Sequence, residues 1–145
     1  MKGFVCKCCG FVSLEGDIKK CPICMQENVF EEKEDAYKSP DFKAETGESE
    51  KKHIPQLGIK TTCKSIEGVK VVHVKVGEIT HPMLPEHHIA EITFYLNKKF
   101  VSNVMLSENI NPIATIHLKD GASGKVQVIE TCNLHGKWFN EVEIK

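Results

Sequence analysis

The sequence predicts a mainly β protein in which a small cysteine-rich metal-binding ribbon precedes an antiparallel β-sandwich or barrel. Five of the seven cysteines lie within the first 26 residues, which predicts the ribbon. The remainder contains short runs of β-branched and aromatic residues separated by turn sequences such as KDGASGK, which predicts the sheets. A chain of 145 residues accommodates one small module and one domain of ordinary size.

The composition divides the chain into three parts. We assign residues 1–30 to the cysteine module, 31–50 to an acidic linker and 51–145 to the β domain. Residues 27–50 carry nine acidic side chains against three lysines, with few large apolar groups, as is typical of a linker or extended arm.

Charge and hydropathy exclude two classes of protein. The formal net charge of −1 and the pI near 6.6 lack the basic footprint of a general nucleic-acid binder. The first residues, MKGFVCKCCG, contain no apolar signal region, and no apolar run approaches the roughly 18 residues that span a bilayer. We therefore expect a cytoplasmic protein, in which seven cysteines favour metal ligands or reactive thiols over disulfides.

The second half of the chain has the alternation of half-buried strands. In HHIAEITFYL, one side is formed by Ala90, Ile92, Phe94 and Leu96, and the residues between them form the other. Similar runs are GVKVVHVKV, FVSNVML, IATIHL, KVQVIETC and KWFNEVEI. Six or seven such strands predict an antiparallel sandwich or barrel.

Two cysteine pairs near the N-terminus have the spacing of metal-binding knuckles. Cys6 and Cys9 form the first pair, Cys21 and Cys24 the second, and each pair is separated by two residues. This spacing lets both thiolates of a pair face one ion, so two pairs can enclose a metal tetrahedrally. Gly10 suits the unusual backbone angles of such a turn.

The spacing leaves the metal of this module open between zinc and iron. Cys8 is a spare thiol, and a zinc ribbon that only folds the module is the structural alternative. The pattern CKCCGFV followed by CPIC resembles the rubredoxin-like domain at one end of rubrerythrins. That resemblance implies a single iron bound by four cysteines and carrying one electron.

Three local groups in the β domain supply a second set of ligand types. They are KKHIP with His53, HPMLPEHH with His81 and His87, and CNLHGKW with Cys132 and His135. Cys132 and His135 fit three interpretations: a metal site, a Cys/His nucleophile pair, or two residues that share a turn. Because several candidates cluster, we favour a site for a transition ion such as iron, copper or zinc.

The order and spacing of these groups are similar to those of the superoxide reductase family, known as neelaredoxin and desulfoferrodoxin. The similarity spans roughly residues 50 to 145 and implies an immunoglobulin-like β-barrel. It also implies catalytic ferrous iron with one axial thiolate, Cys132, and four equatorial imidazoles, those of His53, His81, His87 and His135. Five protein ligands would leave a sixth position for superoxide, which is reduced by one electron to hydrogen peroxide.

Lys52 matches a family lysine that is implied to attract the superoxide anion and assist proton delivery. The family commonly reads Glu-Lys-His here, and the resemblance implies that this glutamate closes the sixth position of the resting ferric iron. In this chain two lysines separate Glu50 from His53, so either a local backbone bulge restores the reach of Glu50 or the glutamate role is absent, and we favour its absence. We expect structural roles for the other candidates, namely His73, His88, His117 and Cys63. Trp138 and Pro82 are expected to pack against the site and orient its ligands.

These inferences predict a superoxide reductase, an oxidoreductase with iron in the β domain and iron or zinc in the cysteine module. The expected partners are superoxide, an external electron donor such as rubredoxin, and further copies of the chain in a dimer or tetramer. The alternative is a non-enzymatic iron-binding electron-transfer protein with a structural zinc ribbon. A superoxide pulse distinguishes the enzyme from the electron-transfer protein, because only the enzyme oxidises the iron of its β domain rapidly and yields peroxide.

Overall fold

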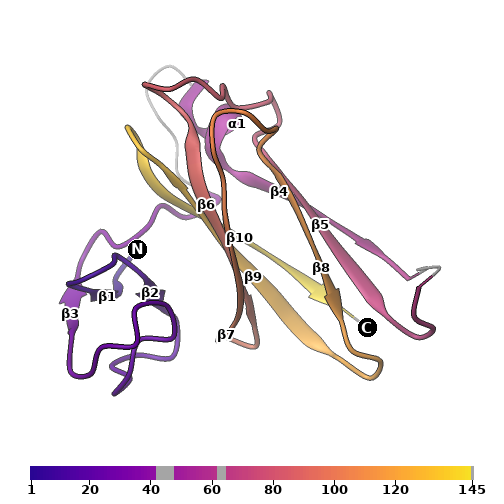
Figure 1. The fold of residues 1–145 in the computed structure, drawn as a ribbon, viewed down its shortest axis with the longest axis horizontal. Coiled ribbons are helices and arrows are strands. Elements are labelled where there is room, and N and C mark those ends of the chain that lie inside the picture. The colour runs from indigo at the N-terminus through magenta and orange to yellow at the C-terminus, as the bar shows by residue number, and fades with distance from the viewer. Residues whose placement is uncertain (42–47, 62–64, 145) are drawn as a thin grey trace.

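The structure, a computed structural model, describes residues 1–41, 48–61 and 65–144, which form three antiparallel sheets and one short helix (Figure 1). The elements are β1 (Gly3–Cys6), β2 (Val12–Ser13), β3 (Phe30–Lys33), α1 (Glu48–His53), β4 (Pro55–Lys60), β5 (Lys70–Val76), β6 (Ile89–Leu96), β7 (Lys99–Met105), β8 (Ile113–Leu118), β9 (Gly124–Cys132) and β10 (Gly136–Ile144). The predicted mainly β fold is confirmed. No helix of the described residues is long and apolar enough to cross a membrane.

The larger part of the chain is a two-sheet sandwich. Its sheets have the strand orders β10-β9-β6-β7 and β4-β5-β8, and side chains from both fill the space between them. The buried core includes Val72, Val74, Ile92, Phe94, Ile116, Val126 and Val128. Alternation places these residues inward because successive side chains of a strand point to opposite faces.

Two features of β6 differ from the simple alternation that its sequence predicts. The pairing of β6 with β9 shifts register between Ile89 and Glu91, so that Ile89 is fully buried and Ala90 only partly. A bulge of this kind inserts one unpaired residue and changes which side chain faces the core. Tyr95, expected on the outer side, is 1% exposed because the N-terminal module covers that face.

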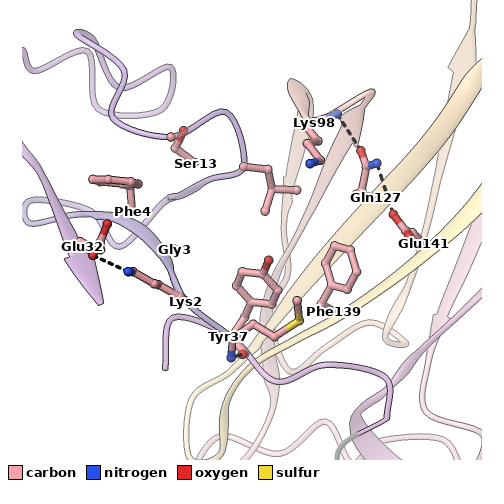
Figure 2. Close-up of a pocket in the computed structure, with 13 residues that line it drawn as sticks. Lys2, Gly3, Phe4, Ser13, Glu32, Tyr37, Lys98, Gln127, Phe139 and Glu141 are labelled. Carbon is pink, nitrogen blue, oxygen red and sulfur yellow. Dashed lines mark hydrogen bonds and ion pairs between the residues drawn. The ribbon is translucent and has the colours of Figure 1, made fainter. Parts of the chain in front are cut away.

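The N-terminal module is a small sheet of order β2-β1-β3 that packs beside the four-stranded sheet (Figure 1). The Phe11 ring stacks on Tyr95 at a centroid distance of 5.9 Å, and the Tyr95 hydroxyl donates a hydrogen bond to the Val12 carbonyl at 2.6 Å. A cavity of about 510 Å³ lies between the module and the sandwich, with Tyr37 and Phe139 in its lining (Figure 2). The module is therefore docked on the β domain.

The acidic segment between the two parts contains ordered structure. Its first residues belong to β3, and Ala36 and Tyr37 are both 8% exposed. Lys38 forms a parallel bridge with Trp138 of β10. The chain then reaches α1, which lies at one end of the sandwich and ends at His53 (Figure 1). The boundaries at residues 30 and 50 stay a prediction.

Candidate metal centres

The four predicted cysteine ligands of the N-terminal module face one another. Their sulfur atoms all lie within 4.8 Å, with 3.6 Å from Cys6 to Cys24 and 3.6 Å from Cys9 to Cys21. Sulfurs bound about 2.3 Å from one ion at tetrahedral corners lie roughly 3.8 Å apart, so these distances fit a tetrahedral site. Gly10, which follows Cys9, has a φ of 82°, as the knuckle requires.

Backbone amides of the first knuckle stabilise the Cys6 thiolate. Burial, the largest single influence, acts to raise the pKa of Cys6, but the amides of Cys9 and Cys8 donate to its sulfur and lower that pKa to about 7. Burial raises the pKa of Cys9 and of Cys21. Cys8 is exposed and lies outside the four-sulfur cluster, which agrees with its prediction as a spare thiol.

The five predicted ligands of the β domain come from four separate segments and meet at one end of the sandwich. His53 ends α1, His81 follows β5, and His87 precedes β6. Cys132 ends β9, and His135 lies in the turn to β10. The ligand atoms of His53, His87, Cys132 and His135 all lie within 4.8 Å of one another, and His81 Nε2 is 3.1 Å from His53 Nε2.

The four imidazole rings form a square. The ring centroids are 4.6 Å apart between His53 and His81, and 4.7 Å apart between His81 and His87. They are 4.9 Å apart between His87 and His135, and 5.0 Å apart between His135 and His53. Neighbouring rings meet edge to face, with interplanar angles of 68° to 81°. The diagonal from His53 to His87 is 6.5 Å. Cys132 Sγ lies 3.5 Å from His81 Nε2 and 3.8 Å from His135 Nδ1. Four rings and one sulfur therefore converge.

The protonation states of this cluster fit a metal site. Burial lowers the pKa of His81 to about 4, although its Nδ1–H donates to the Pro82 carbonyl at 2.7 Å. Burial also lowers the pKa of His87, whose Nε2 is buried and has no hydrogen-bond partner among the described residues. A neutral imidazole is the form that binds a metal, and an ion would satisfy the buried His87 nitrogen.

Cys132 is poorly suited to act as a nucleophile. Its side chain is 2% exposed, and burial raises the pKa of its thiol against the amides of Leu134 and His135, which donate to the sulfur. A reactive cysteine needs a lowered pKa and solvent access. A bound cation would stabilise the thiolate instead, so the geometry favours ligation over the Cys/His nucleophile interpretation.

A glycine that the sequence analysis missed brings two ligand segments together. Gly77 has a φ of 87°, and a Cβ at this position would lie 2.3 Å from the Ile79 carbonyl oxygen and 2.5 Å from that of Lys52. Its amide donates to the Ile54 carbonyl at 3.2 Å. The end of α1 with His53 can therefore approach the loop that leads to His81 only if residue 77 has no side chain.

Asn133 joins the other two ligand segments. Its side-chain Oδ1 accepts a hydrogen bond from the His88 amide at 2.9 Å, and its Nδ2 donates to the Glu86 carbonyl at 3.1 Å. Its own amide donates to the His88 carbonyl at 3.2 Å. The loop that carries His87 is thus attached to the turn that carries Cys132.

Replacing Asn133 by alanine is expected to lower the free energy of unfolding by about 1–2 kcal/mol and to speed metal loss, because two hydrogen bonds between the ligand segments disappear. Urea unfolding and metal release to a chelator would measure both effects. Replacing the exposed Asn109 by alanine is the matched control. Equal effects of the two substitutions would contradict the role of Asn133 in joining the two ligand segments.

The expected packing residues lie where predicted, and one buried acid was missed. Trp138 is 1% exposed, and its ring stacks on that of His53 with a centroid distance of 4.8 Å and an interplanar angle of 14°. Its Nε1 donates to the His135 carbonyl at 3.1 Å.

Glu130 of β9 is fully buried, and burial raises its pKa well above the usual range for a carboxyl group. The alternation in KVQVIETC predicts an apolar residue at this core position of β9, so the sequence gives no indication that a carboxyl group is buried there.

The remaining candidates lie outside the five-residue cluster. His73 and His117 belong to β5 and β8, and His88 Nδ1 donates to the Leu84 carbonyl at 3.0 Å. Lys52 is half-buried directly before His53, and its positive charge contributes to the lowered pKa values of His81 and His87. Cys63 and the side chain of Glu50 lie outside the described part of the chain.

Comparison with known proteins identifies the family of the β domain. The family described as desulfoferrodoxin matches residues 45–141. The chain belongs to the desulfoferrodoxin family. The match includes all five residues of the square site and leaves the four-cysteine cluster outside it.

Named relatives of this desulfoferrodoxin-family chain agree with the match. It is 35% identical to a superoxide reductase of Pyrococcus abyssi over 77% of this chain and 97% of that protein. It is 34% identical to a desulfoferrodoxin of Syntrophotalea carbinolica over 64% of each chain. A solved superoxide reductase (neelaredoxin) from Ignicoccus hospitalis superposes with a TM-score of 0.60 at 29% identity, covering 75% of this chain and 94% of that one.

Proposed function

We propose that this protein is a superoxide reductase that converts superoxide, one electron and two protons into hydrogen peroxide. The square of four imidazoles with the Cys132 sulfur beside it carries the proposal, because it supplies five ligands from four segments. The family membership and the superoxide reductases among the relatives support it.

The ligand set proposed for the catalytic iron is His53, His81, His87 and His135 with Cys132 as the thiolate. Bound ferrous iron would supply the electron and an open position for a small oxygen anion. The protein orients the rings: Pro82 fixes the His81 tautomer through its carbonyl, and Trp138 supports the His53 ring. The amides of Leu134 and His135 hold the sulfur by donating to it.

The four-cysteine module is proposed to hold a second iron that accepts electrons from an external donor such as rubredoxin. Its thiolate-only ligand set and tetrahedral spacing suit iron, and zinc there would make the module purely structural. We further propose that the protein acts in the cytoplasm as a dimer or tetramer. Metal quantitation distinguishes two irons per chain from one iron and one zinc.

A superoxide pulse applied to the reduced protein tests the function. We expect oxidation of the iron held by the four histidines and Cys132 at a rate near the diffusional ceiling of about 10⁸–10⁹ M⁻¹s⁻¹, with hydrogen peroxide formed in equal amount. Time-resolved absorption after pulse radiolysis measures the rate of iron oxidation, and a peroxidase assay measures the hydrogen peroxide. Slow oxidation without peroxide would leave the non-enzymatic electron carrier as the better description.

Replacing Lys52 by alanine is expected to slow the second-order reaction about threefold to tenfold at low ionic strength and to flatten its salt dependence. The reason is that the half-buried ammonium, adjacent to His53, raises the local concentration of the superoxide anion. The rate measured from low to high salt gives both quantities.

Replacing Lys51 by alanine is the matched control, because Lys51 is exposed and the net charge changes equally. An unchanged salt profile in the Lys52 variant, or the same flattening in both variants, would count against steering by Lys52.

A further inference from the structure

The segment that leaves the N-terminal module is fixed against β10 beside the square site. The Lys38 amide donates to the Lys137 carbonyl at 2.9 Å, and the Phe139 amide donates to the Lys38 carbonyl at 2.9 Å. The Tyr37 ring packs on Phe139 at a centroid distance of 5.2 Å (Figure 2). These backbone hydrogen bonds and the ring contact of Tyr37 therefore fix the backbone position of Lys38.

The Lys38 side chain reaches the turn that carries His135 and directly follows Cys132. Its Nζ donates to the His135 carbonyl at 3.0 Å, the same oxygen that Trp138 Nε1 contacts at 3.1 Å. The ammonium also lies 4.8 Å from the centroid of the Trp138 ring, within the range of a cation–π contact. One carbonyl thus receives a charged donor and a neutral donor, which fixes the orientation of the His135 peptide.

The approach of Lys38 depends on the shape of this turn. Gly136 follows His135 with a φ of 79°, and a Cβ there would lie 3.4 Å from Lys38 Nζ. Lys38 is half-buried, so its charge is less screened than that of an exposed lysine.

We propose that Lys38 is a positioning residue of the iron site, contributed by the N-terminal region, which holds the His135 turn and places a permanent positive charge beside it. The inference rests on the proposed function and deepens it. Residue 38 lies outside the family match at 45–141, so the contact is a feature that the N-terminal region adds to the β domain. A cation beside the site favours the less positive, ferrous state of a bound iron.

The decisive variants are Lys38→Met, which removes the charge and the donor, and Lys38→Arg, which keeps both. Lys99→Met, at an exposed position of β7, is the control for the loss of one charge. In the iron-loaded full chain, we expect Lys38→Met to lower the Fe(III)/Fe(II) midpoint potential, to shift the thiolate-to-iron absorption and to speed iron release about threefold to tenfold. Lys38→Arg should restore all three, and Lys99→Met should change none.

The single tryptophan provides a second readout that needs neither iron nor turnover. Because Lys38 lies over the ring of Trp138, the emission of the metal-free protein should shift in Lys38→Met and remain as in the parent chain in Lys38→Arg and Lys99→Met. Failure of superoxide turnover with these shifts present would reject the proposed function and leave the role of Lys38 intact. An unchanged potential, absorption and emission in folded Lys38→Met, or equal shifts in Lys99→Met, would overturn the inference.

Discussion

We expect that replacing Cys132 by serine removes the thiolate-to-iron absorption of the ferric protein and greatly slows the reduction of superoxide. The sulfur is buried, and it lies 3.5 Å from His81 Nε2 and 3.8 Å from His135 Nδ1. A serine oxygen at this position is a harder ligand that stays protonated at neutral pH, so it cannot donate electron density as a thiolate does. We expect the second-order rate to fall by at least about 10²-fold, as is typical when a group essential to the chemistry is removed.

Cys8→Ser is the matched control for this substitution. Cys8 is exposed and lies outside the four-sulfur cluster, so the change should leave the absorption and the rate unaltered. Absorption and electron paramagnetic resonance spectra of both variants, with iron quantitation, separate loss of the thiolate ligand from loss of the metal. A Cys132→Ser protein that keeps the absorption band and reduces superoxide at the parental rate would refute the assignment of Cys132 as an iron ligand.

Short-range patterns carried most of what the sequence predicted correctly. The two knuckles lie within 19 residues, and the strands of the sandwich each follow their own alternation, so local spacing alone determines both. The candidate ligands of the square were also found locally, because His81 with His87 and Cys132 with His135 form compact groups. Their convergence with His53 was available only through the resemblance to a family.

Contacts between distant segments could not be predicted from such patterns. Tyr95 reads as an outward residue of an alternating strand, but the N-terminal module lies on that face and buries it. Lys38 reads as one cation of an acidic linker, yet a parallel bridge brings it to His135, 97 positions along the chain. Glu130 occupies a core position because its strand must also place Cys132, two residues later, on the same face.

The bulge in β6 illustrates a different limit. The alternation of HHIAEITFYL favours Ala90 as the first inward residue, whereas the register shift makes Ile89 the buried one. Periodicity specifies a face only while the pairing is regular, and one inserted residue reverses it. The shift also sets where the strand begins relative to His87, so it bears directly on the position of a ligand.

Gly77→Ala is expected to disrupt the square site severely although residue 77 is not one of the five ligands. A left-handed φ costs a residue with a Cβ about 1–2 kcal/mol, and here the added carbon would also overlap two carbonyl oxygens, those of Ile79 and Lys52. Since neither oxygen belongs to a flexible side chain, the end of α1 and the loop after β5 must separate. We expect the free energy of unfolding to fall by more than about 2 kcal/mol and the square site to lose its iron.

Gly58→Ala tests whether this loss is specific to position 77. Gly58 lies in β4, where an added Cβ meets no atom within 4 Å among the described residues, so the substitution should be neutral or slightly stabilising. Urea unfolding, iron content and the thiolate-to-iron absorption distinguish the two variants. If Gly77→Ala kept its iron and its absorption, as Gly58→Ala is expected to do, the positions of His53 and His81 would not depend on the close approach at Gly77. The nearest atoms to a Cβ at residue 77 belong to Ile79 and Lys52 and not to the four-cysteine module, so a metal bound in that module should stay bound in both variants.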